Sequence, residues 1–379
     1  MAHNSTVLSQ LLKLIPRHEF ESAARRHHRG RRLRSIRRWD QLVALATAQL
    51  TRRASLRDLV SNLRAQSHKL YHVGARPVSR SSLARVNRDQ PASLYQEIYE
   101  KLLARTSPHA PRHQFKFQGK LFSLDATFLK LTASMFPWAK FNTAKGAAKL
   151  HIGLDHDGYL PRFVELTDGQ SYDGDWARTL DLPAGSVVVF DRGYVDFKLF
   201  KRLISREIRF VTRHRRDLRY TVLERRPVEP DTGLTSDQLI RMQGKSGLVL
   251  RRIGYRDPES GKHYVFLTNA EDLPALTITQ IYKERWKIEI FFKWIKQNLR
   301  VLNFLGTSPN AVLSQIWVAL IVYLLLQQLK LRAKVEGSLQ KILRLLQLNL
   351  FDRRNLLQLL RPPPKQPPEE QLQLPINAL

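Results

Sequence analysis

The sequence contains no cysteine, and its acidic residues are scarce beside the basic ones. There are 33 Asp and Glu against 63 Lys and Arg, so the formal net charge is +30. The lack of cysteine excludes disulfides and thiolate-bound zinc and fits a reducing compartment. The shortage of acids implies a polyanionic partner, with nucleic acid as the leading candidate. Because 43% of the residues are hydrophobic, the chain has enough apolar surface to form packed cores.

Long hydrophobic runs are missing as well. The longest, IWVALIVYLLL at residues 316–326, is shorter than the roughly 20 residues that a membrane-spanning helix needs. The first residues of the chain also lack the apolar stretch of a signal peptide. The sequence therefore predicts a buried core helix at 316–326, no membrane partner, and a cytoplasmic protein that is associated with the nucleoid if its polyanion is DNA.

The segment YKERWKIEIFFKWIKQNLR, residues 282–300, has the periodicity of an amphipathic helix. On a helical wheel, Tyr282, Arg285, Glu289 and Lys296 fall within an arc of about 60° beside an apolar stripe. A solvated charged face is the ordinary explanation of such a column. However, Arg and Lys bind phosphates and Glu is a hard oxygen ligand, so the column also suits a metal ion held against a nucleic-acid backbone.

Two aspartates lie in or beside apolar, strand-like segments. Asp125 follows LFSL and Asp191 follows SVVVF. A buried carboxylate is costly unless it has a partner, and a hydrogen-bonded Asp at a strand end is the common explanation for either residue alone. Together with Glu289 they would form a set of three carboxylates, which can bind two divalent ions for phosphodiester chemistry. Asp155 and Asp157 fit a hairpin turn instead.

Arginines are concentrated in the N-terminal part of the chain. The segment RRHHRGRRLRSIRR at 25–38 has no acid, and we expect its Arg31 and Arg32 to contact DNA phosphates, with a solvated basic surface as the alternative. The segment VSRSSLARVNRD at 78–89 predicts a short helix. With the helix before it, this is either a helix-turn-helix whose second helix reads the major groove, or a plain helical hairpin. The outward-facing arginines of the second helix are Arg80, Arg85 and Arg88.

The periodicity of the chain predicts an α/β fold built from several regions. Helical patterns dominate both ends, and strand patterns dominate the middle. The predicted regions are a helical, basic DNA-binding domain at 1–110, a catalytic core with a mixed sheet at 111–213 and 277–308, a β-rich insert at 214–276, C-terminal helices at 309–360 and a proline-rich tail at 361–379.

The candidate residues resemble one known family. The column at 282–296 has the spacing Tyr-x2-Arg-x3-Glu-x6-Lys, which is the signature of the insertion-sequence-4 family of DDE transposases. The motifs DATF at 125–128 and DRGY at 191–194 are similar to the first and second aspartate motifs of that family, in the same order. The resemblance covers about residues 115–330, and the helical segment before it resembles the N-terminal domain of one branch.

The resemblance implies a ribonuclease-H-like core with a β-rich insert, preceded by a helical DNA-binding domain and followed by C-terminal helices. It implies that Asp125, Asp191 and Glu289 are both catalytic and metal-binding, with Mg²⁺ as the cofactor and Mn²⁺ able to substitute. We expect these three side chains to converge within metal-binding distance. The implied partners are double-stranded DNA, as transposon ends and as target, and a second copy of the chain in the DNA complex. The residues that would hold the backbone of the transposon end are Tyr282, Arg285 and Lys296, and we expect Arg285 and Lys296 to be exposed on the helix surface.

The resemblance further implies cut-and-paste transposition through a DNA hairpin, with a flipped base stacked on a tryptophan of the insert. This sequence departs from that pattern, since it has no Trp between residues 192 and 285. Trp286 lies beside the column on the helical wheel and is the candidate to contact DNA in its place.

Two other functions remain open at this level. One is a metal-dependent DNA nuclease without strand transfer. The other is a catalytically silent protein that binds DNA through its basic N-terminal segment, although an intact set of three carboxylates argues against it.

Overall fold

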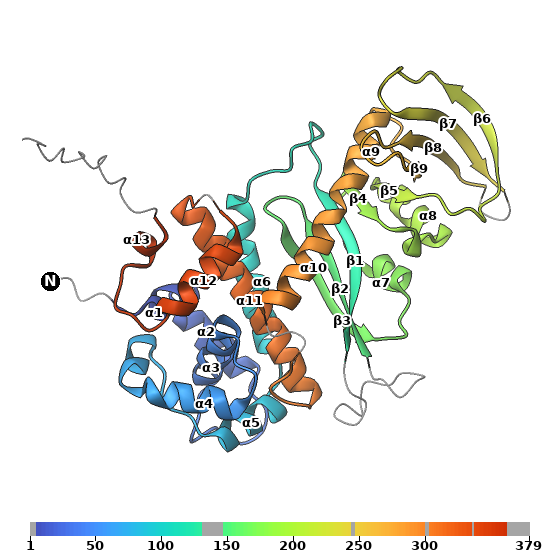
Figure 1. The fold of residues 1–379 in the computed structure, drawn as a ribbon. Helices are drawn as coiled ribbons and strands as arrows, with labels where there is room; N and C mark the ends of the chain where they lie inside the picture. The colour runs from blue at the N-terminus through green and yellow to red at the C-terminus, as the bar shows by residue number, and fades with distance from the viewer. Residues whose placement is uncertain (1–4, 131–146, 244–246, 300–302, 336, 362–379) are drawn as a thin grey trace, which may run out of the picture.

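The computed structural model describes residues 5–130, 147–243, 247–299, 303–335 and 337–361. Figure 1 shows a helical body formed by both ends of the chain, beside a sheet that carries helices on its two faces.

The helical body combines segments from before and after the sheet. Helix α11 packs against α3, α5, α6 and α12, and so connects the two sets of helices. The helices before the sheet are α1 (Val7–Leu12), α2 (Arg17–Arg26), α3 (Arg38–Thr51), α4 (Leu56–Ala65), α5 (Arg80–Asp89) and α6 (Ser93–Thr106), with the 3-10 helices η1 (Ser67–Val73) and η2 (Ser107–His109). Those after it are α11 (Pro309–Ala333), α12 (Leu339–Asn349) and α13 (Leu356–Leu360).

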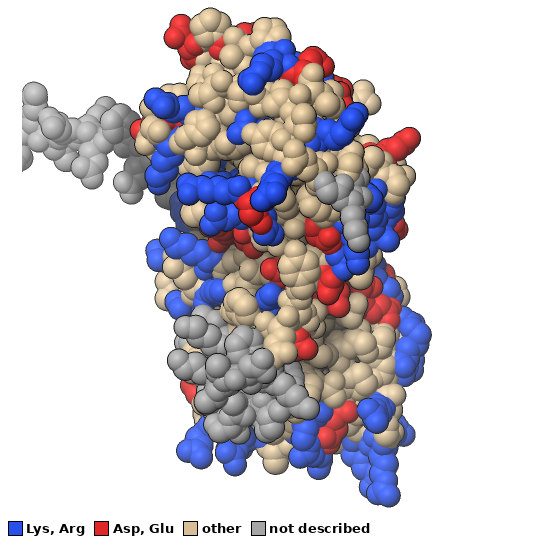
Figure 2. Space-filling model, turned by 90° about the vertical axis from the view of Figure 1, so that its right-hand side faces the viewer, with Lys and Arg blue, Asp and Glu red and all other residues tan. Residues whose placement is uncertain are grey.

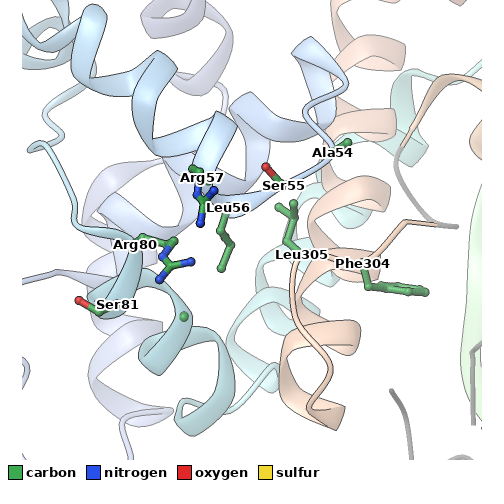
Figure 3. A pocket seen from close by; sticks show the side chains of 9 residues that line it. Ala54, Ser55, Leu56, Arg57, Arg80, Ser81, Phe304 and Leu305 are labelled. Carbon is green, nitrogen blue, oxygen red and sulfur yellow. The ribbon is translucent and has the colours of Figure 1, made fainter. Parts of the chain in front are cut away.

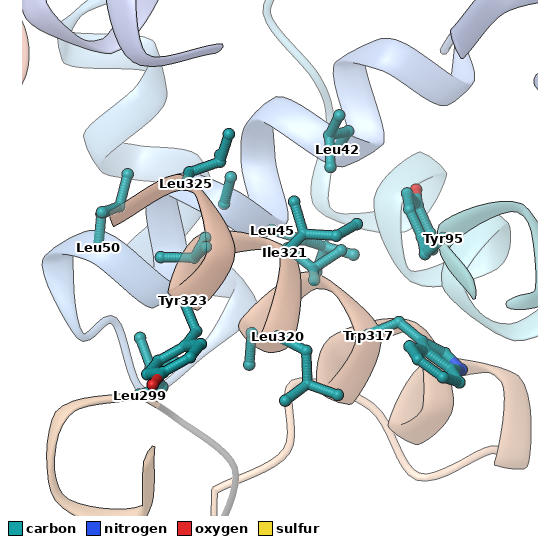
Figure 4. Packing of buried hydrophobic residues seen from close by; sticks show 14 of the residues in the cluster. Leu42, Leu45, Leu50, Tyr95, Leu299, Trp317, Leu320, Ile321, Tyr323 and Leu325 are labelled. Carbon is teal, nitrogen blue, oxygen red and sulfur yellow. The ribbon is translucent and has the colours of Figure 1, made fainter. Parts of the chain in front are cut away.

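Helix α11 forms the centre of the helical body. Figure 4 shows Ile321 of α11 next to Leu45 of α3, and Leu42 of α3 and Tyr95 of α6 belong to the same buried hydrophobic cluster. The predicted buried core helix at 316–326 is therefore confirmed, within a longer helix. In the described part of the chain it is the one helix long and apolar enough to cross a membrane, and 89% of that stretch is buried inside the protein. A helix that is apolar all round is expected in such a core.

The first strands form the sheet that carries the candidate site. Strand β1 pairs with β2 in antiparallel and with β4 in parallel orientation, and the order is β3-β2-β1-β4-β5. This is the strand order of a ribonuclease-H-like sheet, so the predicted fold class is confirmed. The strands are β1 (Leu121–Lys130), β2 (Ala147–Asp155), β3 (Leu160–Asp168), β4 (Val187–Phe190) and β5 (Arg209–Arg213).

The β-rich segment predicted after β5 continues this sheet. Strand β9 pairs with β5, which gives a nine-stranded sheet whose far edge is β6. A buried ion pair, Arg251 Nη2 to Asp237 Oδ2 at 2.6 Å, joins β8 to β7, and Arg251 also donates to the Leu273 carbonyl. The strands are β6 (Tyr220–Arg226), β7 (Leu234–Met242), β8 (Val249–Arg256) and β9 (His263–Thr268). Sequence periodicity predicted strands here but not their pairing with the core.

Helices cover both faces of the core sheet. Alternation along β1 places Phe122 and Leu124 in the cluster with α7 and α8, whereas Leu121 lies in the cluster with α9. Residues Ser123, Asp125 and Thr127 share the face of Leu121 by the same alternation. The helices are α7 (Asp173–Thr179), α8 (Phe197–Ser205), α9 (Ala275–Glu284) and α10 (Trp286–Asn298), and a 3-10 turn, η3 (Arg192–Tyr194), follows β4.

Candidate active site

Asp125 lies in the middle of β1, on the face that α10 covers. Its side chain is 23% exposed, and its Oδ1 accepts a hydrogen bond of 2.8 Å from the amide of Ala126. Burial raises the pKa of Asp125 to about 6, and the charges of Asp191 and Glu289 act in the same direction, while Arg285 opposes them. A half-buried carboxyl group whose pKa is raised, although a guanidinium lies beside it, is typical of a functional site.

Asp191 directly follows β4, the strand that runs parallel to β1. Its Oδ1 accepts a hydrogen bond of 2.8 Å from the amide of Gly193, and its own carbonyl accepts one from Thr212. A Cβ on Gly193 would lie 2.9 Å from the same Oδ1, closer than such atoms approach in proteins. The glycine of the DRGY motif therefore lets the chain turn back onto the aspartate and fix its carboxylate.

Glu289 lies in the first turn of α10, and Arg285 forms the joint between α9 and α10. The sequence predicted one continuous helix, whereas two helices meet at Arg285 through hydrogen bonds of the 3-10 type. Arg285 Nη2 lies 2.6 Å from Glu289 Oε1, and its Nη1 lies 3.9 Å from Asp125 Oδ2. The Arg285 side chain is only 13% exposed, so it is a half-buried counter-ion of two carboxylates and not a surface cation as we expected.

The three carboxylates share one region, yet they do not meet at one point. Their charges act on one another, since Asp191 and Glu289 both raise the pKa of Asp125. Within the described ranges, however, no three Asp, Glu or His side chains lie close enough together to hold a metal ion. The expected convergence to metal-binding distance is therefore not seen. Repulsion among three anions opposes it, and Arg285 occupies the space between Asp125 and Glu289.

The other members of the helical column also face the sheet. The Lys296 ammonium donates a hydrogen bond to Thr127 Oγ1 on β1, so it is half-buried and not an exposed cation. Trp286 is 58% exposed and Ile290, one turn further along α10, is 50% exposed. Helix α10 thus presents two apolar side chains, Trp286 and Ile290, to solvent beside the column.

A run of aromatic rings leads from the insert to the column. Tyr264 and Phe266 on β9 have ring centroids 6.2 Å apart, and Phe266 lies 4.9 Å from Tyr282. Guanidinium groups lie over both ends of the run, Arg213 at 5.1 Å from the Tyr264 ring and Arg285 at 5.5 Å from the Tyr282 ring. These residues line a hollow of about 510 Å³ together with Tyr255 and Trp286. Sequence analysis missed Tyr255 and Tyr264, although the strand patterns around them were visible.

A second group of candidates lies on the helical body. The segment after α2 is a loop that runs beside α5, where Ser35 and Ser82 hydroxyls are 3.1 Å apart and the Gln90 amide donates to the Arg29 carbonyl. The loop and α5 line a hollow of about 680 Å³. Arg31 and Arg32 belong to this loop and line the hollow, so they lie beside α5.

The arginines of α5 differ in their surroundings. Within the part of the chain that the structure describes, Arg80 and Arg85 form no ion pair, although the charge of Arg85 helps to lower the pKa of Asp89, whereas Arg88 pairs with Asp89 at 2.7 Å. The connection from α4 to α5 contains η1, so the tight turn of a helix-turn-helix is not present. Helix α5 nevertheless keeps Arg80 and Arg85 exposed while Leu83 and Val86 are buried.

Arg57 is a residue that sequence analysis missed. It lies at the start of α4, and Figure 3 shows its side chain and that of Arg80 reaching into the same hollow of about 510 Å³. The other lining side chains include Leu56, Phe304 and Leu305, and no acid is among them. Two cations directed into one hollow repel each other unless an anion lies between them.

The sheet side of the molecule has a different charge pattern. Figure 2 shows Lys and Arg side chains around its edges, while Asp and Glu side chains gather toward its middle. The excess of positive charge is therefore spread over both bodies and is not limited to the N-terminal segment.

Comparison with known families gives two matches. The model described as "Transposase DDE domain" matches residues 116–325, which is more than half of the chain and includes Asp125, Asp191 and Glu289. A model described as "Domain of unknown function (DUF4372)" matches residues 3–76.

Three curated relatives are similar over most of their length. The putative transposase y4zB of Sinorhizobium fredii is 31% identical over 75% of this chain and 81% of that protein. The probable transposase for insertion sequence element IS5377 of Geobacillus stearothermophilus is 27% identical over 66% of this chain and 67% of that protein. The putative transposase for insertion sequence element IS4SA of Synechocystis is 24% identical over 70% of this chain and 76% of that protein. A solved structure of a piggyBac transposase synaptic complex with hairpin DNA has a TM-score of 0.47 and 13% identity, covering 90% of this chain and 79% of that one.

Proposed function

Since this chain belongs to the family of the transposase DDE domain, and is therefore a DNA transposase that depends on divalent metal, we propose that Asp125, Asp191 and Glu289 are its catalytic carboxylates. The observation that carries this proposal is the coupling of the three side chains. They come from β1, the end of β4 and α10, and the charges of two of them act on the pKa of the third. The insertion-sequence-4 family remains our proposal for the branch to which the chain belongs.

The three carboxylates suit a divalent ion in their chemistry. They offer hard oxygen ligands, and burial, together with the charges of Asp191 and Glu289, raises the pKa of Asp125 although Arg285 opposes this. We propose Mg²⁺ as the natural ion, with Mn²⁺ able to replace it. When bound, it would activate the attacking water or 3′-hydroxyl and stabilise the leaving oxygen of the phosphodiester.

The residues around the carboxylates would hold the DNA backbone. Arg285 can exchange its contact with Glu289 for a phosphate, because a guanidinium binds both groups through the same paired N–H donors. Lys296, which now donates to Thr127, would bind a neighbouring phosphate as a point charge. Tyr282 lies under the Arg285 guanidinium and would fix its orientation.

The contribution of Lys296 can be measured against a distant lysine. Lys296→Ala should weaken binding of the pre-cut transposon end about tenfold, which corresponds to about 1.4 kcal/mol for one lost phosphate contact. Lys341→Ala removes the same charge from an exposed position on α12 and should leave end binding within about twofold, since a surface charge far from the site has little effect. Equal losses in both variants would show that net charge alone explains the effect.

The aromatic hollow beside Tyr282 is our candidate for an unpaired base. Tyr264, Phe266 and Tyr282 form a run of rings with cations over both ends, and bases stack favourably on such faces. Tyrosines of the insert would thus replace the tryptophan that this sequence lacks, with Trp286 at the rim of the same hollow.

A fluorescent base tests this assignment. With 2-aminopurine at successive positions of the transposon end, Tyr264→Ala should abolish the stacking signal that the wild type gives at one position. Tyr264→Phe keeps the ring and should retain the signal. A signal that survives in Tyr264→Ala but disappears in Trp286→Ala would assign the stacking to Trp286 instead.

For duplex DNA we propose the surface of α5 and the loop beside it. Arg31 and Arg32 would contact phosphates, and Arg80, Arg85 and Arg88 would face the groove. Arg57 extends this surface, because it shares a hollow with Arg80 that suits a phosphate. We further propose that two copies assemble on DNA, since a transposon has two ends, and that the protein is associated with the nucleoid.

Cleavage and joining of labelled end DNA test the proposed function. The wild type should nick end DNA only with Mg²⁺ or Mn²⁺ and should then join it to target DNA. Nicking without joining would favour the nuclease, and binding without nicking would favour the silent DNA-binding protein. Asp191→Asn should bind end DNA and leave it uncut, since it keeps the size of the side chain but not its charge.

A further inference from the structure

A group of three polar side chains, two of them buried and the third partly exposed, lies at the α9–α10 joint. The Ser123 Oγ is 2.6 Å from His156 Nε2, and His156 Nδ1 is 3.9 Å from Glu284 Oε2. Ser123 is fully buried, and His156 is 3% exposed. They come from β1, from the turn after β2 and from the last residue of α9, so only the fold brings them together.

This arrangement looks like a hydrolytic triad, but its burial excludes that role. A nucleophilic serine must reach its substrate, and Ser123 has no exposed surface. Burial lowers the pKa of His156 to about 3, with the charges of His113 and Lys287 in the same direction, so the ring is neutral at physiological pH. A neutral ring with its proton on Nδ1 faces Glu284 and accepts the Ser123 hydroxyl hydrogen at Nε2. The Ser123 end is thus hydrogen-bonded, whereas Nδ1 lies beyond hydrogen-bond distance of Glu284 and only faces its carboxylate.

Both ends of the group adjoin catalytic side chains. Ser123 and Asp125 are two residues apart on β1 and so lie on the same face. Glu284 directly precedes Arg285, whose guanidinium contacts Asp125 and Glu289. The Tyr159 hydroxyl also forms a hydrogen bond with Glu284, and the Tyr159 carbonyl accepts one of 2.9 Å from Tyr323 on α11.

We propose that Ser123, His156 and Glu284 are positioning residues, which clamp the α9–α10 joint to β1 and so set the spacing between Asp125 and Glu289. The inference rests on the proposed function of those two carboxylates. Arg285 cannot hold this spacing during the reaction, because a guanidinium and a divalent ion compete for the same carboxylate oxygens. The clamp does not touch these oxygens and can hold the joint in either state.

Metal binding by the full chain tests the clamp. Ser123→Ala removes one hydroxyl and should weaken Mn²⁺ binding at least tenfold, within the roughly 10–100-fold range that follows loss of residues that orient metal ligands. The readout is free Mn²⁺ by electron paramagnetic resonance. The Mg²⁺ concentration for half-maximal end cleavage should rise by a similar factor. Glu284→Ala changes a partly exposed residue at the end of α9 and should give the same shift. This second variant keeps the test valid if Ser123→Ala, which changes a buried strand, fails to fold.

The matched control is another buried serine at the same sheet. Ser186 directly precedes β4 and is fully buried, and its hydroxyl donates a hydrogen bond of 2.6 Å to the Pro183 carbonyl. Ser186→Ala should lower the melting temperature about as much as Ser123→Ala and leave Mn²⁺ affinity unchanged. If both clamp variants match Ser186→Ala in Mn²⁺ affinity and Mg²⁺ dependence, the clamp is only structural and the inference is wrong. A wild type without metal-dependent cleavage would overturn the proposed function, and the clamp with it.

Discussion

At the scale of single residues, Asp125 bears an energetic cost for its position. Its pKa lies at about 6 in the folded protein, against about 3.9 for an ordinary Asp side chain, because burial and two neighbouring anions disfavour the charged form. A folded-state pKa above the unfolded value means that the folded chain holds the proton more tightly. Stability therefore falls as pH rises from about 4 to 6 and stays reduced above that range.

Asp125→Asn should remove this cost along with the activity. In metal-free buffer the variant should be more stable than the wild type at pH 8, by up to about 3 kcal/mol for a pKa shift of roughly two units. At pH 5 the advantage should be smaller by about 1.4 kcal/mol, since most of the folded wild type is then protonated. Chemical denaturation at both pH values gives the comparison. A variant that is less stable than the wild type at pH 8 would show that the Asp125 carboxylate is structurally required.

Single residues also show what the sequence can reveal. The candidates Asp125, Asp191 and Glu289 follow from motif spacing, whereas the role of Gly193 in fixing Asp191 needed the structure. The half-buried state of Arg285 and Lys296 does not follow from a helical wheel, because the wheel cannot show that β1 lies against that face. His156 is equally hidden, since its partners are 33 residues before it and 128 residues after it.

At the scale of the element, α5 and its neighbours divide DNA binding between two kinds of contact. Arg31, Arg32 and Arg57 lie around α5, and Arg80 and Arg85 lie on it. Phosphate contacts release counterions and so set the dependence of affinity on salt, whereas contacts to base edges discriminate between sequences.

Titrations against end DNA and random DNA at several salt concentrations should separate these contacts. Arg57→Ala, or replacement of Arg31 and Arg32 by Ala, should weaken binding to both DNAs and reduce the salt slope by about one unit per lost contact. Arg85→Ala should instead reduce the difference in binding free energy between end DNA and random DNA, by about 1–3 kcal/mol for a lost base contact. Unchanged discrimination in Arg85→Ala and Arg80→Ala would move end recognition to the insert or the catalytic core.

A buried ion pair joins two strands of the insert. Arg251 bonds Asp237 through two nitrogens and reaches the carbonyl of Leu273 just before α9. Asp237→Ala would leave a buried guanidinium without its counter-ion, and we expect a loss of about 3–5 kcal/mol in the free energy of unfolding. Glu224→Ala breaks the exposed pair with Arg226 and should cost less than about 1 kcal/mol. Similar losses in urea denaturation would mean that solvent reaches Arg251.

At the scale of the whole molecule, the two ends of the chain fold together. Helix α11 buries its surface against α3, α5 and α6, and one hydrophobic cluster contains residues from α1 to α13 as well as β2 and α10. Sequence periodicity predicted helices at both ends, the mixed sheet and the buried run at 316–326. It did not predict this shared core, because an apolar stripe does not identify the helix that will cover it.

A fragment that lacks the first 110 residues tests this view. Removing α1 to α6 would expose the apolar sides of α11, a surface far larger than soluble monomers tolerate. We expect the fragment to aggregate or to lose cooperative unfolding, while the complete chain unfolds in a cooperative transition. Centrifugation and thermal melts monitored by circular dichroism give the comparison. A soluble fragment with metal-dependent nicking would show that the catalytic core is independent.

The shared core also constrains how such a protein can change. A recombination between two related genes with its crossover between α6 and β1 would give a chimera whose leading helices come from one parent and whose α11 comes from the other. Every mismatch along α11 would then fall inside one close-packed interior. The N-terminal helices and the catalytic region that contains Glu289 are therefore expected to be inherited together. A protein that evolves to recognise new DNA ends would then do so by substitutions on the surface of α5, and not by exchange of its N-terminal helices.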